Sequence, residues 1–211
     1  MTIKLFDEDH YLKEFNATVV DIDGKYVELN QTCFYGKGGG QTGDTGTLNG
    51  ERVVMTEYYD EKLWHVMENE PEFNAGDTIQ GVLDWDRRFK IMKLHAASHI
   101  MEHYLWEHFG HMKRTGSHVD DRKDRADYLR DERLDSEILS RVEDDTNEFL
   151  VEGHPVTITV DYDGIRTWRC GPVEMPCAGT HVRNTSEIGS IKLKRKNPGR
   201  GEERVETSLK E

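Results

Sequence analysis

Cysteine is scarce in this chain of 211 residues, which contains only Cys33, Cys170 and Cys177. Three thiols so far apart cannot form the disulfide framework of a small secreted domain. No run of apolar residues approaches the ~18 that a membrane-spanning helix needs. The first residues carry acidic side chains where a signal peptide has an apolar run. These absences predict a cytoplasmic protein with reduced thiols and no membrane partner.

Positive charge is also in short supply, because 28 lysines and arginines face 41 acidic residues and the net charge is -13. This balance argues against a protein that coats nucleic acid by bulk charge, although it allows a local basic surface. Hydrophobic residues make up 35% of the chain, which is enough for a core and excludes wholesale disorder. The length suits one large domain or two small ones.

The first part of the chain, from about residue 17 to 84, has the pattern of short β-strands. Asp23-Gly24 and Asn49-Gly50 each separate two strand-like runs, which is a strong hairpin signal. Several short strands with regular turns are typical of a small barrel or sandwich. We therefore assign a small β-barrel module to residues 1–85.

The pattern changes to α+β in residues 86–211. A run without Gly or Pro and with apolar residues at helical spacing predicts a helix from Arg87 to about Phe109, with Asp86 as its N-cap and Gly110 as its stop. A second helix is expected at about 135–152, and the polar stretch between the helices has room for a short hairpin. Further strands are predicted at 156–160, about 165–168 and 188–193.

Four residues in this second part have the spacing of metal ligands. His95 and His99 lie one turn apart on one helix face, and Cys177 and His181 bring a thiolate and an imidazole close together. Taken singly, such a histidine pair is more often a surface pair and such a cysteine a packed thiol. Together they form a normal donor set for zinc. Four protein ligands would close the site as in a structural zinc, whereas catalysis needs an open position, and the sequence leaves both readings open.

A glycine-rich loop is the second notable feature, with six glycines in residues 36–46. We expect an exposed, adaptable loop whose backbone N–H groups can approach a ligand closely. It is not a P-loop, because the Gly-Lys-Ser/Thr ending is missing, and no helix follows it as in a dinucleotide fingerprint. Composition alone favours a flexible hairpin loop.

The combination of His-x-x-x-His, Cys-x-Gly-Thr-His and Gly-Gly-Gly-Gln-x-Gly-Asp-x-Gly resembles the editing domain of alanyl-tRNA synthetase and the AlaX trans-editing proteins in their medium-length form. The resemblance implies a second part with the fold of the threonyl/alanyl-tRNA synthetase second additional domain. It implies zinc at His95, His99, Cys177 and His181. It also implies a deacylase that removes serine, and in some members glycine, from tRNA(Ala) and spares Ala-tRNA(Ala).

The same resemblance implies roles for residues around the metal. The predicted catalytic residues are Gln41, which is expected to face the editing pocket, and Thr115, which matches a threonine associated with the serine hydroxyl. A local surplus of lysine and arginine at the helix entry and near the C-terminus is expected to meet tRNA phosphates, whereas the acidic stretch from Asp120 to Glu148 is expected to point away from RNA. The predicted substrate-binding residues are Gly38, Gly39, Gly40, Ser98, Thr180, Arg88, Lys194 and Lys196.

Three other functions compete with this interpretation. Threonyl-tRNA synthetase editing domains, which act on Ser-tRNA(Thr), share the ligand plan but favour Pro before the last histidine, where this chain has Thr180, and they lack the glycine-rich module. A non-catalytic, zinc-stabilised RNA-binding module would have a closed metal site. A zinc protease is disfavoured, because no Glu follows His95. The oligomeric state stays open.

Overall fold

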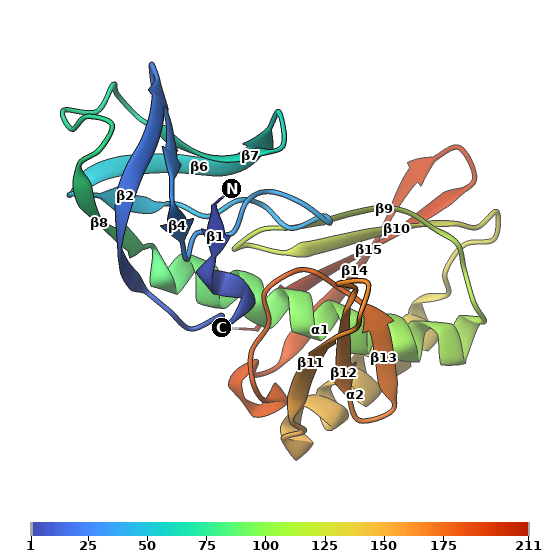
Figure 1. Ribbon diagram of the computed structural model, residues 1–211. Coiled ribbons are helices and arrows are strands. Elements are labelled where there is room, and N and C mark those ends of the chain that lie inside the picture. The colour runs from blue at the N-terminus through green and yellow to red at the C-terminus, as the bar shows by residue number, and fades with distance from the viewer. Residues whose placement is uncertain (1, 211) are drawn as a thin grey trace. The chain divides into compact units, whose positions relative to one another are not determined.

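The computed structural model describes residues 2–210 and shows a mixed α and β protein, mostly sheet, with two α-helices in the described part (Figure 1). The chain divides into two compact units, of which the first ends at Arg88 and the second begins at Phe89. Within residues 2–210 no helix combines the length and the apolar character that a membrane crossing requires.

The first unit consists of short strands, six of which close into a barrel in the order β2-β3-β7-β6-β5-β8. A short 3-10 helix, Leu5–Asp7, follows β1, and β1 pairs in parallel with β4. The strands are β1 (Ile3–Lys4), β2 (Glu14–Asp23), β3 (Tyr26–Leu29), β4 (Gln31–Thr32), β5 (Gly46–Leu48), β6 (Glu51–Tyr59), β7 (Lys62–Met67) and β8 (Thr78–Leu83).

Local sequence explains the hairpin turns of the barrel only in part. Gly24 follows β2 with a φ of 57°, and Asn49 and Gly50 join β5 to β6 with φ values of 49° and 85°. Asn49 and Gly50 both have positive φ, which fits the strand twist, and β2 pairs with β3 as β5 does with β6, so both predicted hairpins are confirmed. Asp60 and Glu61 join β6 to β7 with positive φ but without glycine, which is why no dipeptide signal marked this turn.

The first unit buries an apolar core together with a few polar side chains, among them one histidine. His65 on β7 is fully buried, with Nε2 2.8 Å from Thr32 Oγ1 and Nδ1 3.1 Å from the carbonyl oxygen of Val27. Both ring nitrogens therefore have partners, as buried polar atoms require. The surrounding core side chains include Phe15, Ala17, Val19, Val27, Leu29, Phe34, Leu48, Val53, Met67 and Ile79.

The second unit combines most of helix α1 with a second helix and two antiparallel sheets, in the orders β14-β15-β10-β9 and β11-β12-β13. A 3-10 helix, Thr185–Glu187, precedes β14. The elements are α1 (Trp85–Phe109), β9 (Arg114–Val119), β10 (Asp124–Leu129), α2 (Ser136–Glu152), β11 (Val156–Val160), β12 (Arg166–Cys170), β13 (Val173–Pro176), β14 (Ile191–Gly199) and β15 (Glu202–Leu209).

The helix ends follow from capping chemistry, with one correction. Helix α1 starts at Trp85, so Asp86 lies inside its first turn and is not the N-cap predicted from the sequence. Gly110, with a φ of 77°, follows the last residue of α1 as expected. Asp135 caps α2 by accepting hydrogen bonds from two backbone N–H groups of the first turn, and Gly153 ends that helix in the left-handed conformation.

Strands β13 and β15 were not predicted, whereas the hairpin between the helices, formed by β9 and β10, was. The inward side chains of β15 include Glu203, Val205 and Thr207, which are all buried. Only one of these three is apolar, so the sequence of β15 lacks the alternation of apolar and polar residues that predicts a strand. An ion pair between Glu203 and Arg195 of β14 allows the carboxylate to be buried there.

Candidate metal centre and the residues around it

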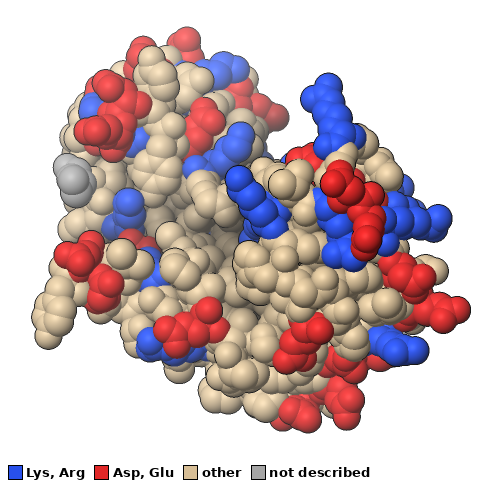
Figure 2. All heavy atoms as spheres, turned by 90° about the vertical axis from the view of Figure 1, so that its right-hand side faces the viewer, with Lys and Arg blue, Asp and Glu red and all other residues tan. Residues whose placement is uncertain are grey.

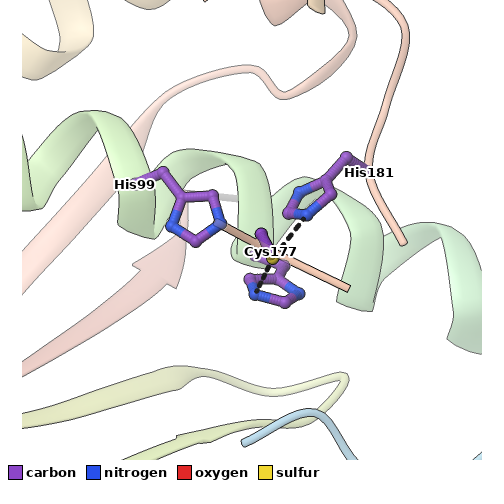
Figure 3. A group of neighbouring side chains, drawn as sticks. His99, Cys177 and His181 are labelled. Carbon is purple, nitrogen blue, oxygen red and sulfur yellow. Dashed lines mark hydrogen bonds between the residues drawn. The ribbon is translucent and has the colours of Figure 1, made fainter. Parts of the chain in front are cut away.

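The predicted ligands come together in the second unit from two parts of the chain. His95 and His99 are both buried on one face of α1. Cys177 follows the last residue of β13, and its backbone N–H donates to the carbonyl oxygen of Arg166 at 2.9 Å, which fixes the loop against β12. His181 lies one short turn further on. Figure 3 shows the rings of His99 and His181 on either side of the Cys177 thiol.

The distances among these four side chains suit a single ion. One donor atom from each of His95, His99, Cys177 and His181 lies within 4.8 Å of all the others. Cys177 Sγ is 3.2 Å from His181 Nε2 and 3.6 Å from His95 Nε2 (Figure 3). Donor atoms around a tetrahedral ion bound at ~2.0–2.3 Å are separated by distances of this order. The group could therefore hold a metal ion.

The hydrogen-bond pattern at His99 supports this conclusion. Both ring nitrogens of His99 are buried, and neither has a hydrogen-bond partner within residues 2–210. A buried imidazole without partners carries a large desolvation penalty, which a metal bond would remove. The indole of Trp168, itself fully buried, lies against this ring with centroids 4.9 Å apart. The residues present thus fit a metal held by nitrogen and sulfur donors.

The electrostatics of the site act on both kinds of ligand. Burial lowers the pKa of His99 well below its ordinary value, which favours the neutral imidazole that binds metals. Burial raises the pKa of the Cys177 thiol, whereas a backbone hydrogen bond at Gly179 and the positive charges of Arg114 and Arg166 lower it. Because metals bind the thiolate, these last three contributions favour coordination.

A buried ionic network borders the site, and the sequence analysis missed it. Glu102 lies three residues after His99 on α1, and its Oε1 is 3.1 Å from Arg114 Nε. The same oxygen accepts a hydrogen bond from the Tyr128 hydroxyl at 2.9 Å. Burial raises the pKa of the neighbouring Asp124 carboxyl to about 7. The position of Glu102 on the helix face of the two histidines was the available signal.

The glycine-rich loop differs from the exposed, adaptable loop that was expected. Only residues 37–40 reach solvent, and most of the loop is buried. Gly39 and Gly40 form a tight turn with φ values of 56° and 85°, closed by two backbone hydrogen bonds between Gly38 and Gln41. A Cβ on Gly43 would lie 1.9 Å from the carbonyl oxygen of Thr56, so close backbone packing requires this glycine. Gln41 is buried in the first unit, and its role in an editing pocket stays a prediction.

Arg88 is not the tRNA-binding cation that the sequence predicted. Its side chain is 1% exposed, and its Nε lies 2.9 Å from Asp44 Oδ2. A terminal nitrogen also pairs with this carboxylate and donates to the carbonyl oxygen of Cys33 at 2.9 Å. The guanidinium is therefore engaged by partners inside the first unit, where its ion pair with Asp44 anchors the end of the glycine-rich loop. Asp44 is the residue of the glycine motif whose structural importance the sequence analysis overlooked.

The remaining predicted residues divide by exposure. Ser98 is buried, and its hydroxyl donates to the carbonyl oxygen of His95 at 2.9 Å, while Thr180 is fully buried beside His181 in sequence. Thr115 is exposed on β9 at a bulge, where the pairing with β10 skips one residue. Lys194 and Lys196 are exposed on β14. Figure 2 shows lysine and arginine side chains in local groups among acidic ones.

Two family models match parts of this chain. The family model described as the threonyl and alanyl tRNA synthetase second additional domain matches residues 165–207, which contain Cys177 and His181. The model described as tRNA synthetases class II (A) matches residues 3–87.

Relatives match over the whole length. The alanyl-tRNA editing protein AlaX-M of Pyrococcus horikoshii is 39% identical over 99% of this chain and 98% of its own length. The AlaX-M protein of Saccharolobus solfataricus is 33% identical over the full length of both. The alanine–tRNA ligase of Methanococcus vannielii is 34% identical over 97% of this chain, which spans 25% of that enzyme. The chain belongs to the AlaX-M family of alanyl-tRNA editing proteins.

Proposed function

We propose that this chain is a zinc-dependent deacylase that hydrolyses the ester of Ser-tRNA(Ala), with Gly-tRNA(Ala) as a second candidate substrate, and spares Ala-tRNA(Ala). The observation that carries the proposal is the group of four donors within 4.8 Å of one another. Full-length similarity to alanyl-tRNA editing proteins supports the choice of tRNA.

The donor set makes zinc the preferred ion. Three imidazoles and one thiolate are the mixture of nitrogen and sulfur donors that suits Zn²⁺. Mg²⁺ and Ca²⁺ are disfavoured, because they prefer oxygen ligands. When bound, zinc acts as a Lewis acid at a carbonyl and lowers the pKa of water. His95, His99, Cys177 and His181 would hold it, and the Trp168 ring packed on His99 excludes solvent from one side.

A residue that hydrogen-bonds the hydroxyl of the serine substrate explains why Ala-tRNA(Ala) would be spared. The aminoacylation pocket of a synthetase specific for alanine rejects serine by a factor of only ~10², because serine differs from alanine by one added hydroxyl. An editing site that pairs with that hydroxyl leaves a polar group unsatisfied when alanine is bound, which costs about 1–3 kcal/mol. We assign this role to Thr115, whose exposed position at the β9 bulge leaves its hydroxyl accessible to a ligand.

Deacylation assays test the proposal directly. Ser-, Gly- and Ala-tRNA(Ala), with Ser-tRNA(Thr) as the mismatched tRNA, are incubated with the protein before and after chelation and with the Cys177→Ala variant. We expect hydrolysis of Ser-tRNA(Ala) that is lost on chelation, restored by zinc and absent in the variant. Hydrolysis that is unaffected by both treatments would overturn the metal-dependent mechanism.

The completeness of the four-donor set favours a second candidate, a metal-stabilised RNA-binding module without catalysis, because four protein ligands close a zinc site. This candidate predicts that chelation lowers the melting temperature and that no seryl ester is cleaved under any condition. Serine release that follows zinc content, measured beside thermal unfolding, separates the two functions.

A further inference from the structure

A hollow of about 350 Å³ opens in the second unit between the first turns of α2 and strand β14. It is lined mainly by basic and hydroxyl side chains, which is unusual for a chain with a net charge of -13. The residues that matter here are Arg133, Ser136, Ser140, Lys192, Lys194 and Arg195. We call this feature the α2–β14 hollow.

Two buried carboxylates, one in the lining and one on the neighbouring strand β15, pair with basic residues of the hollow. Glu143 accepts a hydrogen bond from the backbone N–H of Leu193 at 2.8 Å, and its other oxygen lies 3.6 Å from Lys192 Nζ. Glu203 pairs with both sides of the Arg195 guanidinium. Glu143 is shared between Lys192 and Lys210, whose Nζ lies 3.2 Å away. Two of the four basic side chains of the hollow, Lys192 and Arg195, therefore already have a carboxylate partner. The single acidic residue of the lining, Glu143, is therefore already engaged.

The other two cations are unengaged. Arg133 and Lys194 are exposed, and within residues 2–210 neither side chain has an ion pair or a hydrogen bond. The hydroxyls of Ser136 and Ser140, four residues apart on α2, lie on the same helix face. Two free cations and two hydroxyls facing one hollow are the donors that proteins use for phosphate oxygens.

We propose that the α2–β14 hollow binds a phosphate of an RNA sugar-phosphate backbone. The proposal rests on the proposed function, which makes a tRNA the substrate. Lys196 continues the row of exposed lysines along the outer face of β14, two residues beyond Lys194, so the positive surface extends past the hollow as a polyanion requires and a single small anion does not. RNA then contacts the start of α2, in the stretch that the sequence predicted to point away from it.

The test measures how tRNA(Ala) binding depends on salt for the full chain. Arg133→Gln, Lys194→Gln and the double variant are compared with Arg122→Gln, which removes the same charge from an exposed position outside the hollow. We expect the slope of log K against log salt to fall by ~0.7–0.9 for each hollow cation removed and to stay unchanged for Arg122→Gln. Ser140→Asp should weaken binding strongly, because it places a negative charge in the hollow, and Ser140→Ala should weaken it only slightly, because it removes one hydroxyl donor.

Deacylation of Ser-tRNA(Ala) by the same variants separates this proposal from the proposed function. A raised KM with unchanged kcat is expected, because these residues contact the body of the RNA. An unchanged slope and KM in the double variant would overturn the hollow as an RNA contact. Inorganic phosphate that binds in millimolar titrations while the tRNA slope stays unchanged would also overturn it, as a site for free anions. Altered slopes in a protein without deacylase activity would retain the hollow and overturn the proposed function.

Discussion

Two buried histidine environments in this molecule differ in one respect, the presence of partners. In the barrel, both ring nitrogens of His65 have partners within 3.1 Å. In the second unit, neither ring nitrogen of His99 has one within residues 2–210. Burial lowers the pKa of both imidazoles, so the pKa alone does not distinguish them. The comparison teaches that a buried histidine whose ring nitrogens have no protein partner outside a donor group is a stronger sign of a ligand site than burial or pKa alone.

The largest effect on zinc content and activity is expected from replacing His99, the buried histidine whose ring nitrogens have no partner in the described part of the chain. His99→Ala should abolish stoichiometric zinc binding and deacylation of Ser-tRNA(Ala), because one of four ligands is lost. His65→Gln is the matched control, since it replaces an equally buried imidazole that has no part in the donor group. Elemental analysis and the deacylation rate are the measurements. Loss of zinc in His65→Gln with retention in His99→Ala would reverse the comparison.

The partnered polar groups of the barrel should instead control stability, and the buried Arg88–Asp44 pair most strongly. Asp44→Ala leaves a buried guanidinium without its carboxylate, and we expect a loss of about 3–5 kcal/mol in the free energy of unfolding. Glu174→Ala breaks the exposed pair with Arg169 and should cost far less, because solvent screens this pair. Urea denaturation of the two variants checks the difference. Equal losses would mean that burial does not set the strength of these pairs.

Acid should weaken the barrel through His65. Burial lowers the pKa of His65 from 6.5 to about 4 in the folded chain. Between these values the unfolded chain binds more protons, so stability is fully present above pH 6.5 and falls as pH decreases toward 4, with a slope of up to about 1.4 kcal/mol per pH unit. Denaturant midpoints from pH 7 to pH 4 should change less in His65→Gln. Identical pH profiles would show that His65 does not cause the dependence.

The smallest effect on activity is expected from removing the Thr115 hydroxyl, which we propose hydrogen-bonds the serine side chain of the substrate. Thr115→Val keeps the shape of the side chain and removes its hydroxyl, so deacylation of Ser-tRNA(Ala) should slow roughly fivefold to 150-fold, the rate equivalent of about 1–3 kcal/mol. Zinc content and melting temperature should not change, because the residue is exposed on β9. Discrimination between Ser- and Ala-tRNA(Ala) that survives this change removes Thr115 from the proposal.

The sequence by itself determined the features that depend on neighbouring residues. Asn49-Gly50 set a turn, Gly110 ended a helix, and His95 and His99 had to share one face, because backbone dihedral angles and helical periodicity are local properties. The identities of the four metal-binding candidates followed from the same short motifs. The mixed α and β character also followed from the change of pattern along the chain.

Only the tertiary structure decided how distant residues are used. It brought Cys177 to within 3.6 Å of His95, and it turned Arg88 from an expected RNA contact into half of a buried ion pair. It also gave the polar strand β15 an inward face through Glu203. Burial and charge pairing are set by residues far apart in the sequence, and a polar side chain looks the same in the sequence whether or not folding supplies its partner.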